Sequence, residues 1–492
     1  TAKGSVRGEV VGSSKFTNSK QVYKFSSIPF AKPPVGELRF ERPQDAETWS
    51  GVLDGTRPIP SPFQDIKVVE MLSKYIVIED IPSKDLHAIS EDCLYLNVYT
   101  NNLNPSANMP VLVWFFGGGL AMGSAIGYSG QTICSMHDVV VVIPNYRVNV
   151  FGFFTAGKDT KWKGNMGFFD QHKALEWTKE NIKSFGGNPD NVTIFGQSAG
   201  AASVGIHMLS PVSRGYFHRA ITHSGTATMP GLCKSDQGEF RKLFLEALNI
   251  TEKDSDEMVA KLKKKPAHKL MEAYTEASKK VGMPLGPFRA SIDGEFVPEY
   301  PSQLIRHSTT SAPVPFMTGC NNTEEFGILS PMIAEFESGA SEETVLGLLQ
   351  WMLMDKPYTT EVAKFMMDTY AKKYSVDDKL KWSKVGGELM ADMLFVVPTI
   401  LQAKGHADSG HPCYVYYMTQ TPAHSHSKEH NLSDSLVMKA DFCECDHGDD
   451  IIFTWGFPYS SAKMSAEVKF TKDEQKMTEQ WMKYIVNFAT TG

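Results

Sequence analysis

A serine flanked by glycines follows a run of apolar residues in the segment NVTIFGQSAG (191–200). Gly196 and Gly200 stand two residues before and two residues after Ser198, and small residues at both places allow a strand to turn sharply into a helix. The apolar residues VTIF before the turn and AASVGIHML after it supply that strand and that helix. The segment predicts a nucleophile elbow with the Ser198 hydroxyl at its corner, although ordinary glycine-containing turns share the five-residue pattern.

A serine hydroxyl is a weak nucleophile at neutral pH, so this interpretation requires a histidine base, a carboxylate that orients the base, and N–H donors for an oxyanion. The segment VWFFGGGLAMG (113–123) contains three glycines after an apolar strand, and no side chain shields their N–H groups. We expect the N–H groups of Gly118 and Gly119, together with that of Ala199, to form the oxyanion hole. Three consecutive glycines are otherwise typical of a flexible loop.

The elements that position these residues alternate between strands and helices. Apolar, strand-like runs occur at residues 111–116, 139–146, 192–196, 220–225, 314–319 and 413–418. Several runs are apolar on both faces, as in the covered strands of a largely parallel sheet. Amphipathic helical patterns, such as that of residues 170–186, lie between them. This alternation predicts an α/β fold.

The chain of 492 residues contains no internal repeat and no Pro/Ser-rich linker. We therefore expect a single domain over residues 1–492. Residues 230–310 and 335–405 are richer in Met and in charged helical sequence. We interpret these two stretches as helical insertions that lie over the sheet and form the wall of a pocket.

The composition argues against several function classes. The net charge is −7, and Lys and Arg are scattered among acidic residues, so we expect no nucleic-acid partner. No window of 18 consecutive residues is apolar, which predicts no transmembrane segment, and the start TAKGSVRG lacks the apolar core of a signal peptide. The seven cysteines are too few for a dense disulfide framework, and we interpret most of them as small apolar fillers.

Several segments, taken together and in this order, resemble those of a known family. They are SEDCLYLNVYT (90–100), VWFFGGG (113–119), NYRVNVFGF (145–153), GNMGFFDQHKALEW (164–177), FGGNPDNVTIFGQSAG (185–200), GCNNTEEFG (319–327) and CDHGDD (445–450). The chain resembles the type-B carboxylesterase and cholinesterase family, and its carboxylesterase branch in particular. The resemblance implies an α/β-hydrolase fold and hydrolysis of carboxylic esters, amides or thioesters through an acyl-enzyme. It also implies a C-terminal end that is truncated relative to the family.

The resemblance also assigns the partners of Ser198. His447, in DHGDD, corresponds to the base, although a surface histidine in an Asp-rich turn would look the same. Counting five residues from Gly319 selects Glu324 as the acid, whereas alignment on the following EFG selects Glu325. We favour Glu324, because the carboxylate has to meet the inward-facing ring of His447 and the adjacent side chain points elsewhere.

Three departures from the family are visible. Phe116 stands where carboxylesterases have His and cholinesterases have Tyr, which predicts reduced activity through a less steady loop. The family's first disulfide would join Cys93 to a cysteine near residues 61–66, which contain none, and the second loop, around residues 248–262, lacks both of its cysteines. Residues 64–92 contain no Trp to bind a quaternary ammonium, so acetylcholine should be a poor substrate.

These observations predict a serine carboxylic-ester hydrolase that needs no metal or organic cofactor and acts on a small-molecule ester as a monomer or weak homo-oligomer. The alternatives are a catalytically weak binding or adhesion member of the same family, or a lipase. The segment HSHSKEH (424–430) is interpreted as a solvated loop and not as a metal site. The missing cysteines argue against secretion, but sequons at Asn191, Asn249, Asn321 and Asn431 slightly favour the secretory pathway over the cytoplasm.

Overall fold

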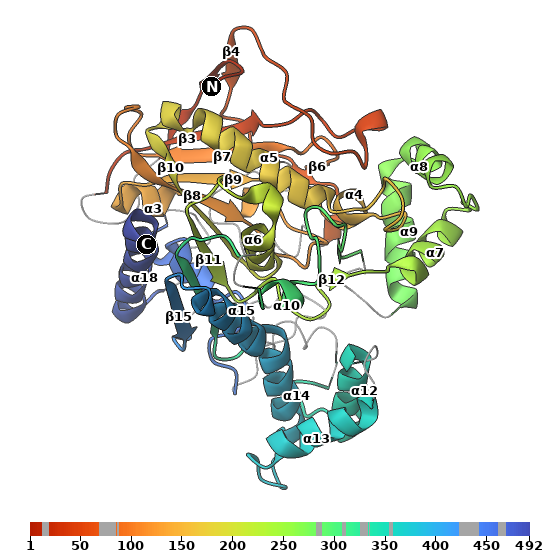
Figure 1. The fold of residues 1–492 in the computed structure, drawn as a ribbon. Coiled ribbons are helices and arrows are strands. Elements are labelled where there is room, and N and C mark those ends of the chain that lie inside the picture. The colour runs from red at the N-terminus through yellow and green to blue at the C-terminus, as the bar shows by residue number, and fades with distance from the viewer. Residues whose placement is uncertain are drawn as a thin grey trace.

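The computed structural model describes residues 1–11, 19–67, 85, 88–281, 288–307, 311–324, 333, 335–353, 358–422, 442–460 and 469–492. Within these residues, nine strands form one mixed sheet in the order β15-β14-β11-β10-β8-β9-β7-β3-β2, visible across the centre of Figure 1. The parallel part consists of β15 (Cys413–Met418), β14 (Phe316–Asn321), β11 (Arg219–His223), β10 (Gly187–Gln197), β8 (Met109–Phe115) and β9 (Val140–Pro144). The antiparallel edge consists of β7 (Tyr95–Thr100), β3 (Val22–Pro29) and β2 (Glu9–Val11).

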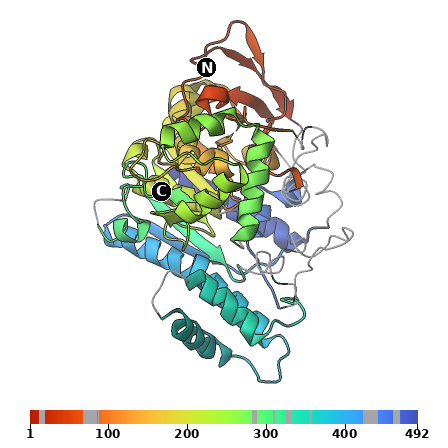
Figure 2. The ribbon, with the colours of Figure 1, turned by 90° about the vertical axis from the view of Figure 1, so that its right-hand side faces the viewer.

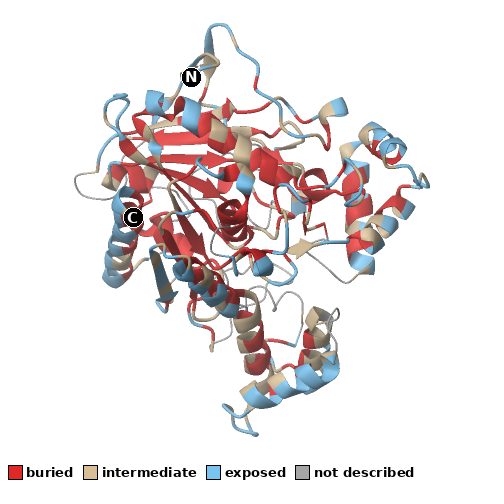
Figure 3. Cartoon of the chain, in the orientation of Figure 1, coloured by how far each residue is buried: buried red, intermediate tan, exposed pale blue. Residues whose placement is uncertain are grey.

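Helices cover both faces of this sheet, which explains why its strands read as continuous apolar runs. Leu112 and Trp114 of β8 pack in one apolar core with α18 (Lys472–Thr491), α3 (Gln131–Met136) and α16 (Asp450–Thr454). Val111 and Val113 of the same strand pack on the opposite face with α5 (Met166–Asn181) and α6 (Ala199–Leu209). Figure 3 shows the buried residues concentrated in the sheet and in the helices against it. Each of the six predicted strand runs overlaps a strand of this sheet, and the predicted α/β class is confirmed.

The two stretches expected to be helical insertions are helical. The first contains α7 (Gly238–Ala247), α8 (Ser255–Lys264) and α9 (Ala267–Lys280), and the second contains α12 (Glu342–Leu353), α13 (Thr359–Ala371) and α14 (Lys381–Ala391). Helices α12 to α14 pack around an apolar cluster of their own, which includes Val345, Met367 and Leu389. Both ribbon views show these three helices extending away from the central sheet (Figures 1 and 2), so the prediction that this stretch lies over the sheet is wrong for α12 to α14.

Helix α14 continues through a π-helical turn, η5 (Asp392–Val396), into α15 (Val397–Asp408). Among the described residues, this continuous helix from Lys381 to Asp408 is the one that is long and apolar enough to cross a membrane, with a mean hydropathy of 1.3 in its most apolar window. Half of that window is buried within the fold, and buried core helices of other proteins have the same length and composition. The helix is therefore weak evidence for a membrane span.

Candidate active site

Ser198 lies at the turn between β10 and α6, as the sequence predicts. Its φ of 56° and ψ of −127° are unusual for a residue other than glycine. A Cβ atom at Gly196 would lie 2.6 Å from the carbonyl of Gly200, and one at Gly200 would overlap the carbonyl oxygen of Phe115. Because only glycine fits at these two positions, the strand and the helix can approach closely enough to force the strained serine to the corner.

The glycine loop after β8 lies directly against this turn. A Cβ atom at Gly117 would be 3.0 Å from Cβ of Ser198. The carbonyl of Gly118 accepts hydrogen bonds from the backbone N–H groups of Ala121 (3.0 Å) and Met122 (3.1 Å). The N–H of Gly119, in the same peptide unit, therefore points the opposite way. In the described part of the chain, no group accepts a hydrogen bond from the N–H of Gly118 or Gly119, and these groups remain available to an anion.

Two side chains hold this loop in place by donating hydrogen bonds to its backbone carbonyls. The Tyr146 hydroxyl donates to the carbonyl of Phe116 (2.6 Å), and the two buried rings stack with centroids 4.2 Å apart. The Arg289 guanidinium donates to the carbonyl of Gly119 (2.9 Å). The side chain of Phe116 makes no hydrogen bond of its own, but its peptide unit is fixed by Tyr146. The third expected donor, the N–H of Ala199, belongs to the first turn of α6, where helical N–H groups have no intrahelical partner.

His447 and Glu324 meet beside the carboxyl ends of the parallel strands. His447 Nδ1 lies 2.7 Å from Glu324 Oε2. The Glu324 carboxylate is fully buried, and its other oxygen accepts hydrogen bonds from the Ser224 hydroxyl (2.6 Å) and the Asn321 N–H. Glu325, the alternative acid, lies outside the described residues. The contact between Glu324 and His447 is the one that an orienting carboxylate and a catalytic base require.

Charges around His447 determine how readily its ring is protonated. Burial by itself would lower the pKa of His447, but the hydrogen bond and negative charge of Glu324, with the charges of Asp446 and Asp450, raise it above its ordinary value. The ring also packs on Phe395 of η5, with centroids 4.5 Å apart. A carboxylate on Nδ1 favours the tautomer that carries its proton on Nδ1, so Nε2 of the neutral ring has a free electron pair.

The structure does not join His447 to Ser198 by a hydrogen bond. His447 Nε2 lies 3.1 Å from Nε2 of the Gln197 amide, and the Ser198 hydroxyl has no hydrogen-bond partner among the described residues. Gln197 was not among the predicted site residues, although it is part of GQSAG itself. The signal in the sequence is its position next to the serine, from which a long polar side chain can reach His447.

A second polar group is buried behind the site. The Asp450 side chain is buried away from solvent. Burial and, after it, the negative charge of Glu324 raise the pKa of its carboxyl group to about 7. Its Oδ1 accepts a hydrogen bond from Asn321 (3.3 Å), and its Oδ2 is 3.5 Å from Nδ1 of His223. Burial lowers the pKa of His223 to about 3, so this histidine is neutral and the two side chains do not form an ion pair.

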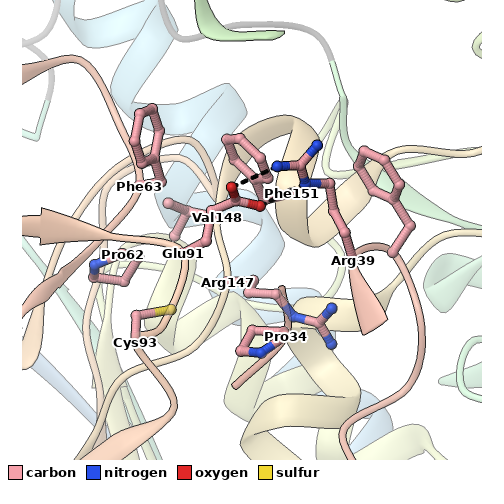
Figure 4. A pocket seen from close by; sticks show the side chains of 10 residues that line it. Pro34, Arg39, Pro62, Phe63, Glu91, Cys93, Arg147, Val148 and Phe151 are labelled. Atoms are coloured by element: carbon pink, nitrogen blue, oxygen red, sulfur yellow. Dashed lines mark hydrogen bonds and ion pairs between the residues drawn. The ribbon is translucent and has the colours of Figure 1, made fainter. Parts of the chain in front are cut away.

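The cavity in Figure 4 is separate from this arrangement. It has a volume of about 10 Å³ and is lined by the Arg39–Glu91 ion pair, Cys93, Pro62 and Phe63, among others. A space of this size holds a single water molecule at most and cannot hold an ester. Cys93 is a buried free thiol that faces the segment in which the family would place its disulfide partner. This agrees with the absence of a cysteine at residues 61–66.

Comparison with known proteins places the chain in a family. The family model described as "Carboxylesterase family" matches residues 1–492. Rat carboxylesterase 1D is 35% identical over 510 residues, which cover 100% of this chain and 85% of that protein. A duck protein named "Fatty acyl-CoA hydrolase precursor, medium chain" is 36% identical (100% of this chain, 84% of that protein), and human cocaine esterase is 34% identical (99% and 82%). The chain therefore belongs to the carboxylesterase family and is a carboxylic ester hydrolase with the α/β-hydrolase fold.

Proposed function

We propose that this carboxylesterase works through an acyl-enzyme in which Ser198 is the nucleophile, His447 the general base and Glu324 the acid that orients the base. Gly118, Gly119 and Ala199 would donate to the oxyanion. The observation that carries the proposal is the 2.7 Å hydrogen bond from His447 Nδ1 to the buried Glu324 carboxylate, which leaves Nε2 as the basic nitrogen. The strained turn at Ser198 adds support, as do the N–H groups of Gly118 and Gly119, which have no acceptor among the described residues.

In the proposed reaction, neutral His447 takes the proton of Ser198 as Oγ attacks the ester carbonyl. The backbone N–H donors stabilise the negative charge that develops on the carbonyl oxygen. The imidazolium then returns its proton to the departing alcohol, and the acyl group stays on Ser198. Water activated by His447 releases the acid by the same steps, while Glu324 keeps the ring in the required tautomer and stabilises its positive charge.

The test is Ser198→Ala in parallel with the unchanged enzyme. Turnover of p-nitrophenyl butyrate should fall by on the order of 10⁴-fold or more, since the nucleophile is lost and the fold is not. An organophosphate should label Ser198 in the unchanged enzyme, with the site located by peptide mass spectrometry. Retained turnover in the variant would contradict the assignment. A folded wild-type protein that takes no label would instead favour a non-catalytic binding or adhesion role.

We further propose that neutral esters of small or medium acids are better substrates than choline esters, because residues 64–92 contain no Trp to bind a quaternary ammonium. The names of the relatives mention carboxylic esters and a fatty acyl-CoA, so acyl length is the variable to measure. A graded panel from acetate to laurate esters, with acetylthiocholine beside them, tests both points. A large preference for acetylthiocholine over butyrate esters would refute the proposal, and a preference for long acyl chains in emulsions would indicate a lipase.

A further inference from the structure

The side chain of Gln197 makes one hydrogen bond within the described part of the chain, and that bond is to His447. Gln197 is the last residue of β10 and is only 5% exposed. Its amide nitrogen lies 3.1 Å from His447 Nε2. A buried amide normally satisfies its donors and acceptors as fully as its surroundings allow. Because its one hydrogen bond among the described residues is to His447, the Gln197 amide can affect the reactivity of the proposed base directly.

The direction of this hydrogen bond follows from the other side of the ring. Nδ1 of His447 carries a proton and donates to Glu324, so Nε2 of the neutral ring can only accept. The Gln197 amide is thus the donor, and it occupies the electron pair of Nε2. In the proposed reaction, the Ser198 hydroxyl needs that same electron pair. Gln197 and Ser198 are adjacent donors that compete for one acceptor.

The residues around Gln197 hold its side-chain amide next to His447. Gln197 pairs with His223 in the sheet, and the N–H of Ser198 donates to the carbonyl of His223 (2.9 Å), which fixes both backbone positions. A Cβ atom at Gly117 would lie 3.0 Å from Oε1 of Gln197, so the glycine leaves the space that the amide group occupies. Phe395 packs on the His447 ring and restricts how far the ring can move away.

We propose that Gln197 is a positioning residue that holds His447 in a resting arrangement by occupying Nε2, and that Ser198 becomes reactive when this bond is released. This inference rests on the function proposed above. In the wild-type enzyme, the hydrogen bond between Gln197 and neutral His447 must break before Ser198 can react. A mutation that removes this hydrogen bond should therefore accelerate the reaction of Ser198 by about threefold to tenfold. A carboxylate at residue 197 would instead stabilise protonated His447 and move the acidic limb of the pH profile upward.

The experiment uses Gln197→Met, which keeps the length of the side chain and removes the donor, and Gln197→Glu. The measured quantity is the second-order rate constant for phosphorylation of Ser198 by paraoxon, followed by the release of p-nitrophenolate between pH 5 and pH 9. Gln197→Met should react about threefold to tenfold faster than wild type at pH 9, the end of this range where the neutral fraction of His447 is greatest. Gln197→Glu should move the midpoint of the acidic limb upward by about one pH unit or more.

Gln350→Met is the matched control, because Gln350 on α12 donates to Thr360 and belongs to the outlying helices. It should match wild type in both measurements. A Gln197→Met rate at pH 9 that equals or falls below the wild-type rate would overturn the inference, as would an unshifted acidic limb in Gln197→Glu. These results would leave the proposed triad intact. Failure of wild-type Ser198 to react with paraoxon at all would instead refute the proposed function.

Discussion

Glu324 Oε2 and His447 Nδ1 lie 2.7 Å apart although 123 residues separate them in the chain. Two backbone contacts bring their loops together. Thr323 forms a β-bridge with Asp446, and the N–H of Thr323 donates to the carbonyl of Cys445 (2.9 Å). The residues next to Glu324 and next to His447 are therefore joined by the main chain. This pairing fixes the carboxylate against the ring before any substrate binds.

The first prediction concerns pH. Glu324 and the neighbouring carboxylates raise the pKa of His447, and in the proposed mechanism His447 must be neutral to act as the base. Activity should therefore rise with pH through a midpoint above the ordinary histidine value of about 6.5 and be lost below it. Glu324→Gln should lower the midpoint and lower kcat/KM by about 10²- to 10⁴-fold, measured from pH 5 to pH 9.

The control for Glu324→Gln is Glu361→Gln, since Glu361 is an exposed residue in the first turn of α13. This variant should keep the wild-type pH profile. A Glu324→Gln enzyme with an unchanged midpoint and rate would show that Glu324 does not act on His447.

The second prediction concerns stability and Asp450, whose pKa is raised to about 7 in the fold. A carboxyl group with a raised pKa binds more protons when folded, so its unfavourable effect on folding is absent below a pH of about 4 and grows as pH rises towards 7. Asp450→Asn remains neutral and keeps an acceptor for Asn321. Its melting temperature should exceed that of wild type at pH 8, with a smaller difference at pH 5. Calorimetry that finds an equal or larger gain at pH 5 would contradict this prediction.

The third prediction concerns the loop of glycines. Tyr146→Phe removes the hydroxyl that donates to the carbonyl of Phe116 and leaves that buried carbonyl without this partner. The free energy of unfolding should fall by about 1–3 kcal/mol. Because this peptide unit precedes the proposed oxyanion donors Gly118 and Gly119, kcat should fall more than KM changes. Tyr484→Phe, at a residue that is 53% exposed, is the control and should alter neither quantity.

The fourth prediction concerns the turn at Ser198. Gly200→Ala would place a methyl group on the carbonyl oxygen of Phe115, which belongs to the backbone of β8 and cannot rotate away. We expect a loss of about 1–3 kcal/mol or more in the free energy of unfolding, measured by urea denaturation, together with lower activity. Gly347→Ala is the matched change, since a methyl group there meets no atom within 4 Å. It should stabilise α12 by about 0.5–1 kcal/mol. Equal stability of the two variants would argue against close packing at the turn.

Local patterns in the sequence predicted the elements and the turn. The apolar runs at 111–116 and 192–196 are strands because their residues fill both faces of a covered sheet. Gly196 and Gly200 indicated the sharp turn at Ser198, because this turn has no space for a Cβ atom at either position and glycine is the residue type without one. The family resemblance supplied the pairing of distant residues, and the extent of a single domain over residues 1–492 stays a prediction.

Tertiary structure decided the contacts that depend on where distant segments meet. Glu324 faces His447 because the two loops are bridged, and no residue type in TEE distinguishes that glutamate from its neighbour. The sequon at Asn321 is buried, with its amide donating to the carbonyl of Asp446 (2.7 Å), so the folded chain offers no access for glycosylation there. The bond from Gln197 to His447 is also a tertiary contact. Local structure follows from short-range sterics that residue types carry, whereas these contacts depend on packing between segments more than 100 residues apart.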